Sequence, residues 1–445
     1  MFAFAVLAIV TFYFLVRLPF MRNLPSGVDA HYHLIATSRF KRGYSPKFLD
    51  KFTVGDNYAH PPLLHSLLSF MPEKVRPQAL FVVGSAFDCC SAILTYYLAE
   101  QIVPWPYPLI AAILYSVTPA AYLQSVSQSA RPLGAFWYNL SIILVAQNNS
   151  LMLIFASVAV ALTLLSHKMA TQTLLFTCLL LSPFLFMANK LFPLALVFGF
   201  GLALLLTKGG YIVTLKDHVG YLKYHFKHGS WDHGTKKPDS PKRLFMFLPF
   251  FYIPIFGLLL SSQIFVQTSL ILAWYMVILA IFFLWLWGDG YRYLAYAALP
   301  TSILSVQALC AGVNALWIIP ALAASALVIY KNLHTQSRQV WPDFSKIKVS
   351  SDSNILVMPS YAGYIVARNL NCKVLWGGGN QESLKFELET LPKIMSDSSS
   401  DLIEKFHVTH LLLGPKNLGF IKPIEGSFER TVETNGYVLF SRKGI

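Results

Sequence analysis

The 445-residue chain is 55% hydrophobic and only 13% charged, with a mean hydropathy of +0.52 and a formal net charge of +14. This composition excludes an ordinary soluble globular protein and predicts a polytopic membrane protein. The excess positive charge predicts an anionic partner, which for a membrane protein includes lipid phosphate. No segment resembles a nucleic-acid-binding module, so no nucleic acid partner is expected. Five cysteines do not indicate a disulfide framework.

Apolar segments long enough to cross a bilayer recur through the first three quarters of the chain. A spanning helix needs about 20 mostly apolar residues, and this rule predicts about 11 membrane helices. The first segment lacks a basic leader and a small-residue cleavage site, so we expect a retained helix and not a signal peptide. The short fifth and sixth segments are also compatible with a re-entrant pair. The expected helices lie near 2–20, 79–99, 106–124, 132–147, 151–166, 172–188, 191–207, 244–262, 264–287, 293–312 and 314–331.

Two polar loops, 21–78 and 208–243, interrupt this apolar body. Beyond residue 331 the composition becomes that of a soluble domain. "NILVMP", "CKVLWGG", "THLLLGP" and "GYVLFSRK" predict strands, and "SSDLIEKFHV" predicts a capped helix. We therefore expect a transmembrane domain over 1–331 and a small α/β domain over 332–445.

The segment "GVDAHYHLIATSRF", residues 27–40, places Asp29 just outside the end of the first apolar segment. A carboxylate in this partly dry environment is suited to act as a base toward a bound hydroxyl group. A helix cap or a surface salt bridge is the alternative.

Histidines are concentrated in the first polar loop. His31 and His33 are followed by His60 and His65 in "NYAHPPLLH", with Asp56 nearby. Imidazole and carboxylate groups are zinc ligands, but this spacing matches no compact metal signature. Hydrogen-bonding histidines are therefore favoured over a metal site. The double proline after His60 predicts a rigid turn that presents this side chain toward the interior of the loop.

Two arginines are candidate phosphate ligands. Arg131 lies in "SVSQSARPLGAFW", where it precedes a proline at a predicted helix start. Arg292 lies with Asp289 between aromatic residues in "WGDGYRYLAYAALP". A guanidinium group can hold phosphate through two hydrogen bonds, although either arginine could instead anchor the helix at lipid head groups.

Two weaker signals complete the sequence pattern. Asp88 lies inside an apolar segment, where an acid is costly; this indicates a function unless a Tyr or Ser partner satisfies the carboxylate. The glycine-rich "WGGGNQE", residues 376–382, lacks the spacing of a dinucleotide-binding or P-loop motif. A turn is expected there.

The motifs "GVDAHYH", "YAHPPLLH", "RPLG" and "RYL" together resemble the GT-C superfamily of membrane glycosyltransferases. The first two are most similar to protein O-mannosyltransferases and bacterial lipid A aminoarabinose transferases. The apolar body and the terminal α/β domain are also similar to the catalytic subunit of oligosaccharyltransferase. The motifs are short, but the resemblance extends over the plan of nearly the whole chain.

The resemblance implies inverting transfer of a sugar from a polyprenyl or dolichyl phosphate donor to a lipid, glycan or protein acceptor. It assigns Asp29 as the base and a basic residue as the ligand of the lipid phosphate. For that ligand Arg292 is the first choice and Arg131 the second. The other expected substrate-binding residues are His60, His31, Tyr291 and Tyr293.

The second outer loop departs from the oligosaccharyltransferase pattern. That type uses a divalent metal held partly by acidic residues of this loop, whereas "TPAAYLQSVSQSARPLG" contains none. We therefore expect chemistry without a cofactor or metal. Asp56, a possible second acid, keeps a divalent metal as the alternative.

The orientation of the chain depends on which rule is followed. With an odd number of helices, both polar loops and the C-terminal domain share one side, which carries nearly all of the Lys and Arg residues. The positive-inside rule makes this side cytoplasmic. The resemblance instead implies the non-cytoplasmic side of the plasma membrane, inner membrane or ER, and we follow it.

A transporter, flippase or ligase for a polyprenyl-linked anionic lipid is the alternative function. A transporter predicts paired, broken or charged mid-membrane segments in two repeated halves. The sequence offers only Asp88 and shows no internal repeat.

Overall fold

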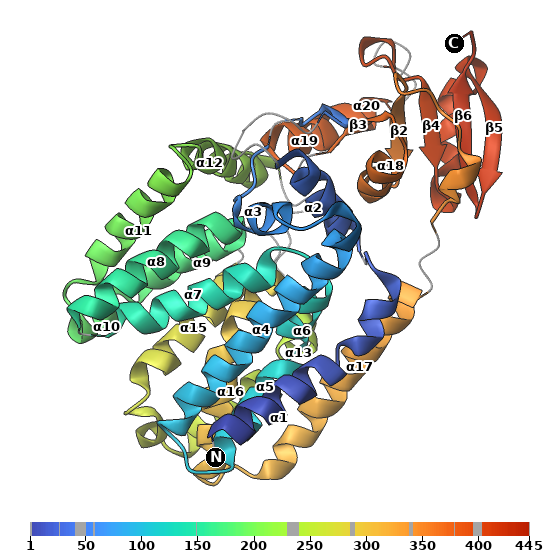
Figure 1. Ribbon diagram of the computed structural model, residues 1–445. Coiled ribbons are helices and arrows are strands. Elements are labelled where there is room, and N and C mark those ends of the chain that lie inside the picture. Colours follow the sequence, from blue (N-terminus) through green and yellow to red (C-terminus); the bar gives the residue numbers. More distant parts are fainter. Residues whose placement is uncertain are drawn as a thin grey trace.

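The computed structural model describes residues 2–25, 27–40, 50–56, 58–147, 149–228, 240–284, 290–337, 341–377, 379–394 and 403–444. These residues form a helical body with one mixed sheet at one end, and the N-terminus lies near the opposite end (Figure 1). Asp289, part of the expected "WGDGYRY" motif, lies outside the described residues, as does the central part of loop 208–243.

The described residues of the expected apolar segments are mainly helical, but several helices are short or bent, and the number of about 11 membrane helices stays a prediction. By length and composition, three of the described helices can cross a membrane, and up to seven if each bent pair forms one span. The body is formed by α1 (Phe2–Leu15), α4 (Arg76–Glu100), α5 (Tyr107–Val117), α6 (Pro119–Val126), α7 (Arg131–Val145), α8 (Ser150–Ser166), α9 (Lys168–Leu180), α10 (Ser182–Ala188), α11 (Phe192–Leu206), α12 (Tyr211–His228), α13 (Pro241–Phe247), α14 (Tyr252–Leu260), α15 (Ser269–Leu284), α16 (Leu294–Cys310) and α17 (Ile318–Ser337).

Proline lies at three of the four breaks between paired helices that the described residues show. Pro119 starts α6 after a bend of 57°, and Pro183 lies in the first turn of α10 after a bend of 73°. Pro249 separates α13 from α14, which are bent by 102°. Proline lacks the amide hydrogen that would continue the helix, so each break falls at the start of the second member. Hydropathy detects the apolar segments but not these bends.

The two polar loops contain more regular structure than the sequence indicated. The segment 21–78 includes α2 (Val28–Arg39), β1 (Phe52–Val54) and α3 (Leu63–Ser69), while α12 occupies much of 208–243. The first helix ends at Leu15 and not near residue 20, and a 3-10 helix follows at Leu18–Asn23. Asp29 therefore lies in the first turn of a separate helix, α2, and not at the end of the first membrane helix.

The sheet draws its strands from both ends of the chain. Its order is β1-β3-β2-β4-β6-β5; β1, β3, β2 and β4 are parallel, and β5 and β6 are antiparallel. The four expected strands are present, whereas β1 and β5 were not predicted. The later strands are β2 (Asn354–Met358), β3 (Lys373–Trp376), β4 (His410–Leu413), β5 (Phe428–Thr434) and β6 (Tyr437–Arg442).

Helices cover the sheet and connect it to the helical body. We refer to the sheet with α18 (Gly363–Asn369), α19 (Gln381–Lys385) and α20 (Leu391–Ile394) as the sheet region. Strand β2 is buried on both faces, as expected of a central strand in a parallel arrangement. One face shares its apolar core with Tyr32, Ile35 and Ala36 of α2. The helix that carries Asp29 is thus packed onto the sheet region.

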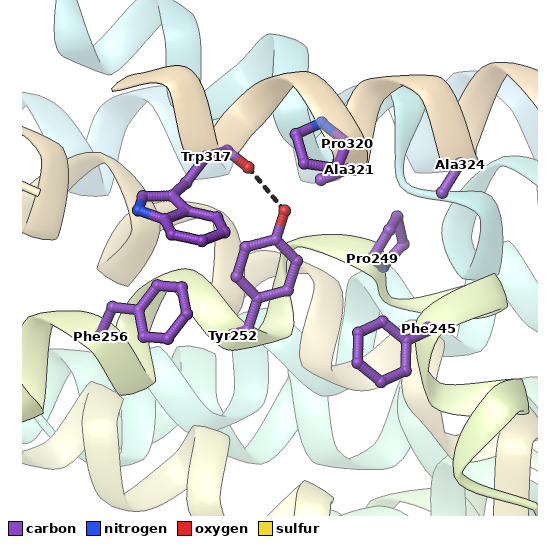
Figure 2. Close-up of a pocket in the computed structure, with 8 residues that line it drawn as sticks. All are labelled: Phe245, Pro249, Tyr252, Phe256, Trp317, Pro320, Ala321 and Ala324. Carbon is purple, nitrogen blue, oxygen red and sulfur yellow. Dashed lines mark hydrogen bonds between the residues drawn. The ribbon is translucent and has the colours of Figure 1, made fainter. Parts of the chain in front are cut away.

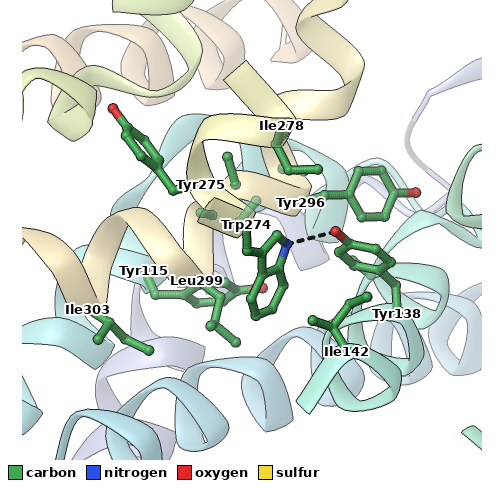
Figure 3. Packing of buried hydrophobic residues seen from close by; sticks show 14 of the residues in the cluster. Tyr115, Tyr138, Ile142, Trp274, Tyr275, Ile278, Tyr296, Leu299 and Ile303 are labelled. Carbon is green, nitrogen blue, oxygen red and sulfur yellow. Dashed lines mark hydrogen bonds between the residues drawn. The ribbon is translucent and has the colours of Figure 1, made fainter. Parts of the chain in front are cut away.

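An aromatic layer joins three helices inside the helical body. Trp274 of α15 donates a hydrogen bond from Nε1 to Oη of Tyr138 in α7 over 2.7 Å (Figure 3). The rings of Tyr138 and Tyr296 meet edge to face, with centroids 5.1 Å apart. Edge-to-face contacts add stability beyond the area buried, and the indole hydrogen is satisfied without water.

Asp88 is held by a buried polar network. Its carboxylate accepts hydrogen bonds from Oη of Tyr13 and Oη of Tyr115, both at 2.6 Å, and from the Arg17 guanidinium at 3.1 Å. Arg17 also donates from Nε to Oγ of Ser125 over 2.8 Å, and both charged groups are almost fully buried. Such pairing is what a charge needs in an apolar interior. It favours the structural explanation of Asp88 over the functional one.

We predict that Asp88→Asn strongly destabilises the protein. The substitution leaves the Arg17 guanidinium buried without a counter-charge, and breaking a buried pair in this way costs about 3–5 kcal/mol. Thermal unfolding of the detergent-solubilised protein measures the effect. Cys90→Ala, at an exposed position of the same helix, is the control. Equal melting temperatures for Asp88→Asn and Cys90→Ala would contradict the structural role.

Candidate active site

Helix α2 brings Asp29 to the junction between the helical body and the sheet region. The helix begins after Gly27, whose φ of 83° is readily adopted only by glycine. Asp29 follows in the first turn, where the partial positive charge of the helix N-terminus favours a carboxylate. The local sequence thus explains why an acid is placed at this point.

Asp29 forms an ion pair with Arg131. Nη2 of Arg131, the first residue of α7, lies 3.3 Å from Oδ2 of Asp29. The Asp29 side chain is 47% exposed and that of Arg131 is 22% exposed. The salt bridge that the sequence left open as an alternative is therefore present, and it leaves nearly half of the carboxylate accessible to a ligand.

Behind Asp29, two histidines and a tyrosine form a buried hydrogen-bonded chain. His33 Nδ1 lies 2.9 Å from His65 Nε2, and His65 Nδ1 is hydrogen-bonded to Oη of Tyr58. Burial lowers the pKa of His33 to about 4, although the nearby Asp29 charge opposes this shift. Burial also holds the pKa of His65 well below its usual value. Both imidazoles are therefore neutral at neutral pH.

His60 is enclosed by α2 and the glycine-rich turn of the sheet region. Its ring lies 4.7 Å from that of Tyr32, between centroids. Gly379 has a φ of 59°, and a Cβ there would come within 3.0 Å of His60 Nε2. Among the described residues, His60 Nε2 has no hydrogen-bond partner although it is buried. Gly379 of the glycine-rich "WGGGNQE" thus lies against the histidine of the double-proline turn.

The sheet region supplies a cation beside His31. Nη1 of Arg368, in α18, lies 3.4 Å from Nδ1 of His31. Burial, and secondarily the Arg368 charge, lower the pKa of His31 to about 4. Because an arginine donates and never accepts, Nδ1 of His31 is the acceptor and the proton of the neutral ring is on Nε2. Arg368 carried no recognisable motif and was not predicted.

A second ion pair connects α9, α12 and the sheet region. Nζ of Lys168 lies 2.9 Å from Oδ2 of Asp217, and Oδ1 of Asp217 accepts a hydrogen bond from the backbone amide of Gln381 over 3.0 Å. Neither Lys168 nor Asp217 was predicted. The one available signal was Asp217 itself, a single acid in the lysine-rich helix α12.

Arg292 lies in a second cationic cluster. Its Nε donates to Oη of Tyr291 over 3.3 Å, and the Arg243 guanidinium lies 4.7 Å from the centroid of the Tyr291 ring. The carbonyl oxygen of Arg292 accepts a hydrogen bond from Gln124 over 3.2 Å. Tyr293 is buried and donates from Oη to Gln172 over 2.8 Å. Arg131, and not Arg292, is the arginine paired with Asp29.

An apolar groove begins next to this cluster. It has a volume of about 310 Å³ and lies between α13 and α14 on one side and α17 on the other (Figure 2). Arg243 precedes the lining residue Phe245 by two positions on α13. The one hydrogen bond drawn in the groove runs from Oη of Tyr252 to the carbonyl oxygen of Trp317, over 2.6 Å. The lining residues are Phe245, Pro249, Tyr252, Phe256, Trp317, Pro320, Ala321 and Ala324.

Asp56, the possible second acid, follows β1 at the edge of the sheet and is exposed. The neighbouring Gly55 accepts a hydrogen bond at its carbonyl oxygen from Nδ2 of Asn380 over 3.0 Å. Within the described ranges, no group of three or more His, Cys, Asp or Glu side chains has the arrangement needed to hold a metal ion.

Comparison with solved structures identifies the fold of the chain. No protein-family model and no curated protein matches the sequence. The Archaeoglobus fulgidus oligosaccharyltransferase in complex with Zn and sulfate matches with a TM-score of 0.59 and 13% identity, over 98% of this chain and 73% of that one. ArnT from Cupriavidus metallidurans bound to undecaprenyl phosphate matches with a TM-score of 0.56 and 13% identity, over 98% and 97% of the two chains.

Both matched proteins are GT-C members. The chain has the GT-C fold. This confirms the resemblance inferred from the short motifs, including the similarity to lipid A aminoarabinose transferases, of which ArnT is one. The GT-C fold is a membrane fold, in agreement with the apolar helices.

We predict that the folded protein loses stability as the pH falls from 6.5 to 4. Unfolding raises the pKa of His33 from about 4 to its usual 6.5, so the unfolded state binds the proton preferentially in this range. His33 alone would contribute about 3 kcal/mol to the loss. Melting temperatures measured against pH test this. His33→Asn should flatten the dependence, whereas His407→Asn, at an exposed site, should leave it unchanged; identical profiles for the two variants would refute the assignment.

Proposed function

We propose that the protein is an integral-membrane glycosyltransferase. It transfers a sugar from a polyprenyl or dolichyl phosphate donor to a lipid, glycan or protein acceptor, with inversion. The supporting observation is a half-exposed carboxylate, Asp29, held by Arg131 at the junction of a GT-C fold. Enzymatic inversion requires one carboxylate as base and cationic groups that stabilise the departing phosphate.

In the proposed step, Asp29 removes the proton from the acceptor hydroxyl group. The acceptor oxygen forms a bond to the anomeric carbon on the face opposite the phosphate, and the bond between that carbon and the phosphate oxygen breaks. The phosphate leaves with the electron pair. His31, in contact with Arg368, and His60, in contact with Tyr32, would position the substrate.

The cationic cluster and the apolar groove support a lipid-phosphate donor. Arg243 and Arg292 share the ring of Tyr291, and the groove-lining Phe245 follows Arg243 by two positions on α13. A charged head beside a narrow apolar groove suits an amphiphile with a phosphate and a hydrocarbon chain. One of the matched structures, ArnT, was solved with undecaprenyl phosphate.

The proposed chemistry assigns no step to a metal, since Asp29 and the arginines fill both required roles. One matched oligosaccharyltransferase structure contains Zn and sulfate. A divalent ion with Asp56 as a ligand is therefore the alternative to be tested by adding and removing metal.

We further propose that residues 1–331 form the catalytic domain and 332–445 an appended domain, and that the polar loops and this domain face the non-cytoplasmic side. The positive charge of that side would then serve anionic ligands. A single cysteine introduced at exposed Ser351 tests the orientation. Labelling of intact cells by an impermeant reagent is expected, and protection of this cysteine would reverse the orientation.

We predict that Asp29→Asn lowers the rate of sugar transfer 10²- to 10⁴-fold, the usual cost of losing a general base. The amide keeps the shape of the side chain, so expression and donor binding should be unchanged. Asp50→Asn is a matched control, because Asp50 is also a half-exposed carboxylate paired with an arginine, Arg39, at 2.7 Å. Wild-type turnover by Asp29→Asn would exclude Asp29 and make Asp56 the next candidate. A flippase using the same groove would not depend on Asp29 for lipid movement.

We predict that Arg292→Lys raises the KM for the donor by roughly 10- to 100-fold, with a smaller effect on the acceptor. Lysine keeps the charge but loses the two-pronged hydrogen bonding, and a hydrogen bond to a charged group contributes about 1.5–3 kcal/mol. Arg430→Lys, on the exposed strand β5, is the control. An unchanged KM for the donor would place the phosphate elsewhere, with Arg131 as the second choice.

A further inference from the structure

Helix α12 runs at a steep angle to α11, the helix that precedes it. It follows α11 after a short glycine-containing turn, and the two helix axes are bent by 114° (Figure 1). α11 is one of the apolar helices of the body. A helix nearly perpendicular to a bilayer-crossing helix lies close to the plane of the membrane surface.

One side of α12 is attached to the rest of the protein. Asp217 binds Lys168 of α9 and the backbone amide of Gln381 in α19. Tyr224 donates a hydrogen bond to Glu389 of the sheet region. A Cβ at Gly220 would clash with the Gln381 side chain, which shows how closely the two elements approach. These contacts fix the rotation of α12 about its own axis.

A different side of α12 is an exposed stripe. Ile212, Lys216, Val219, Lys223 and Lys227 recur at helical spacing and are all exposed. This spacing places the five side chains on one face of the helix. We refer to these five residues as the α12 stripe.

The composition of the α12 stripe distinguishes between three possible environments: water, the hydrocarbon core and the membrane surface. Ile212 is 42% exposed and Val219 is 44% exposed, so the stripe is not simply a solvated polar face. Three lysines in five residues exclude a position inside the hydrocarbon core. Asp217, the one acid in α12, is engaged elsewhere, so the stripe carries positive charge alone. Aliphatic side chains mixed with lysines are typical of a helix at the surface of an anionic membrane.

We propose that the α12 stripe is a binding surface for anionic phospholipid head groups. Its aliphatic side chains enter the interfacial layer and its lysines contact the lipid phosphates. Because Asp217 joins the same helix to Lys168 and Gln381, lipid contact along the stripe steadies the attachment of α12 to the sheet region. The inference does not depend on the proposed sugar transfer, because its test measures lipid contact directly.

The test uses the full chain in vesicles, with a fluorophore on a cysteine introduced at Val219 and with exposed Cys90 and Cys310 replaced by alanine. One set of vesicles is pure phosphatidylcholine and the other contains about 30% phosphatidylglycerol, in the range of anionic biological membranes. Spin-labelled lipid and aqueous iodide serve as quenchers. A cysteine at Ser351, in the exposed turn before β2, is the reference site in water.

We expect spin-labelled lipid to quench the Val219 site about twofold more with phosphatidylglycerol than without it, and added salt to reduce the difference. Replacement of Lys216, Lys223 and Lys227 by glutamine should remove this difference. The matched control replaces three exposed lysines of the sheet region, Lys346, Lys348 and Lys373, and should preserve it.

Two results would overturn the proposal. Iodide quenching at the Val219 site as strong as at the Ser351 site, in both kinds of vesicle, would show that the stripe faces water. Equal lipid quenching with and without phosphatidylglycerol would show lipid contact without recognition of anionic head groups.

Discussion

The parallel pairing of β1 with β3 holds the candidate active site together. Phe52 lies opposite Val374 and Val54 opposite Trp376, so the segment between the first two long apolar helices becomes the edge strand of a sheet built from the last quarter of the chain. A Cβ at Gly55 would clash with the carbonyl oxygen of Gly377, so the two backbones meet closely. This contact brings the glycine-rich turn over His60 and α18 against α2. On the same α18, Arg368 reaches His31 of α2.

Two carboxylates, Asp88 and Asp29, lie in contrasting environments. Asp88 is buried, and its carboxylate accepts hydrogen bonds from two tyrosines and pairs with Arg17. It therefore has a structural role. Asp29 has one charged partner, Arg131, and almost half of its side chain is exposed. A carboxylate that is already fully hydrogen-bonded gains little from a new ligand, whereas an exposed one can accept a proton from a bound hydroxyl group. The number of hydrogen bonds that each carboxylate already accepts, more than its position in the sequence, distinguishes the structural acid Asp88 from the candidate base Asp29.

Neutral histidines and fixed cations determine the electrostatics of the junction. Burial keeps His31 and His33 uncharged, so their imidazoles contribute hydrogen bonds and shape without competing for the Asp29 charge. The positive charge comes instead from arginine and lysine, which stay protonated at any relevant pH. A second cationic cluster beside the apolar groove extends the positive potential toward the membrane helices. The proposed donor, a phosphate attached to a hydrocarbon chain, would match both features.

The apolar helices, the strands β2, β3, β4 and β6, and the acid and histidines of the first polar loop could all be predicted from the amino-acid sequence. These features depend on local periodicity and on turn-forming residues, which can be followed along a short segment. The folded structure was needed to show that Asp29 pairs with Arg131, 102 residues away, and that His31 contacts Arg368 across 337 residues. It was also needed to show that a three-residue segment becomes β1 and that helices are bent at prolines. Contacts over such separations are set by which buried surfaces fit together, and local sequence carries no record of that fit.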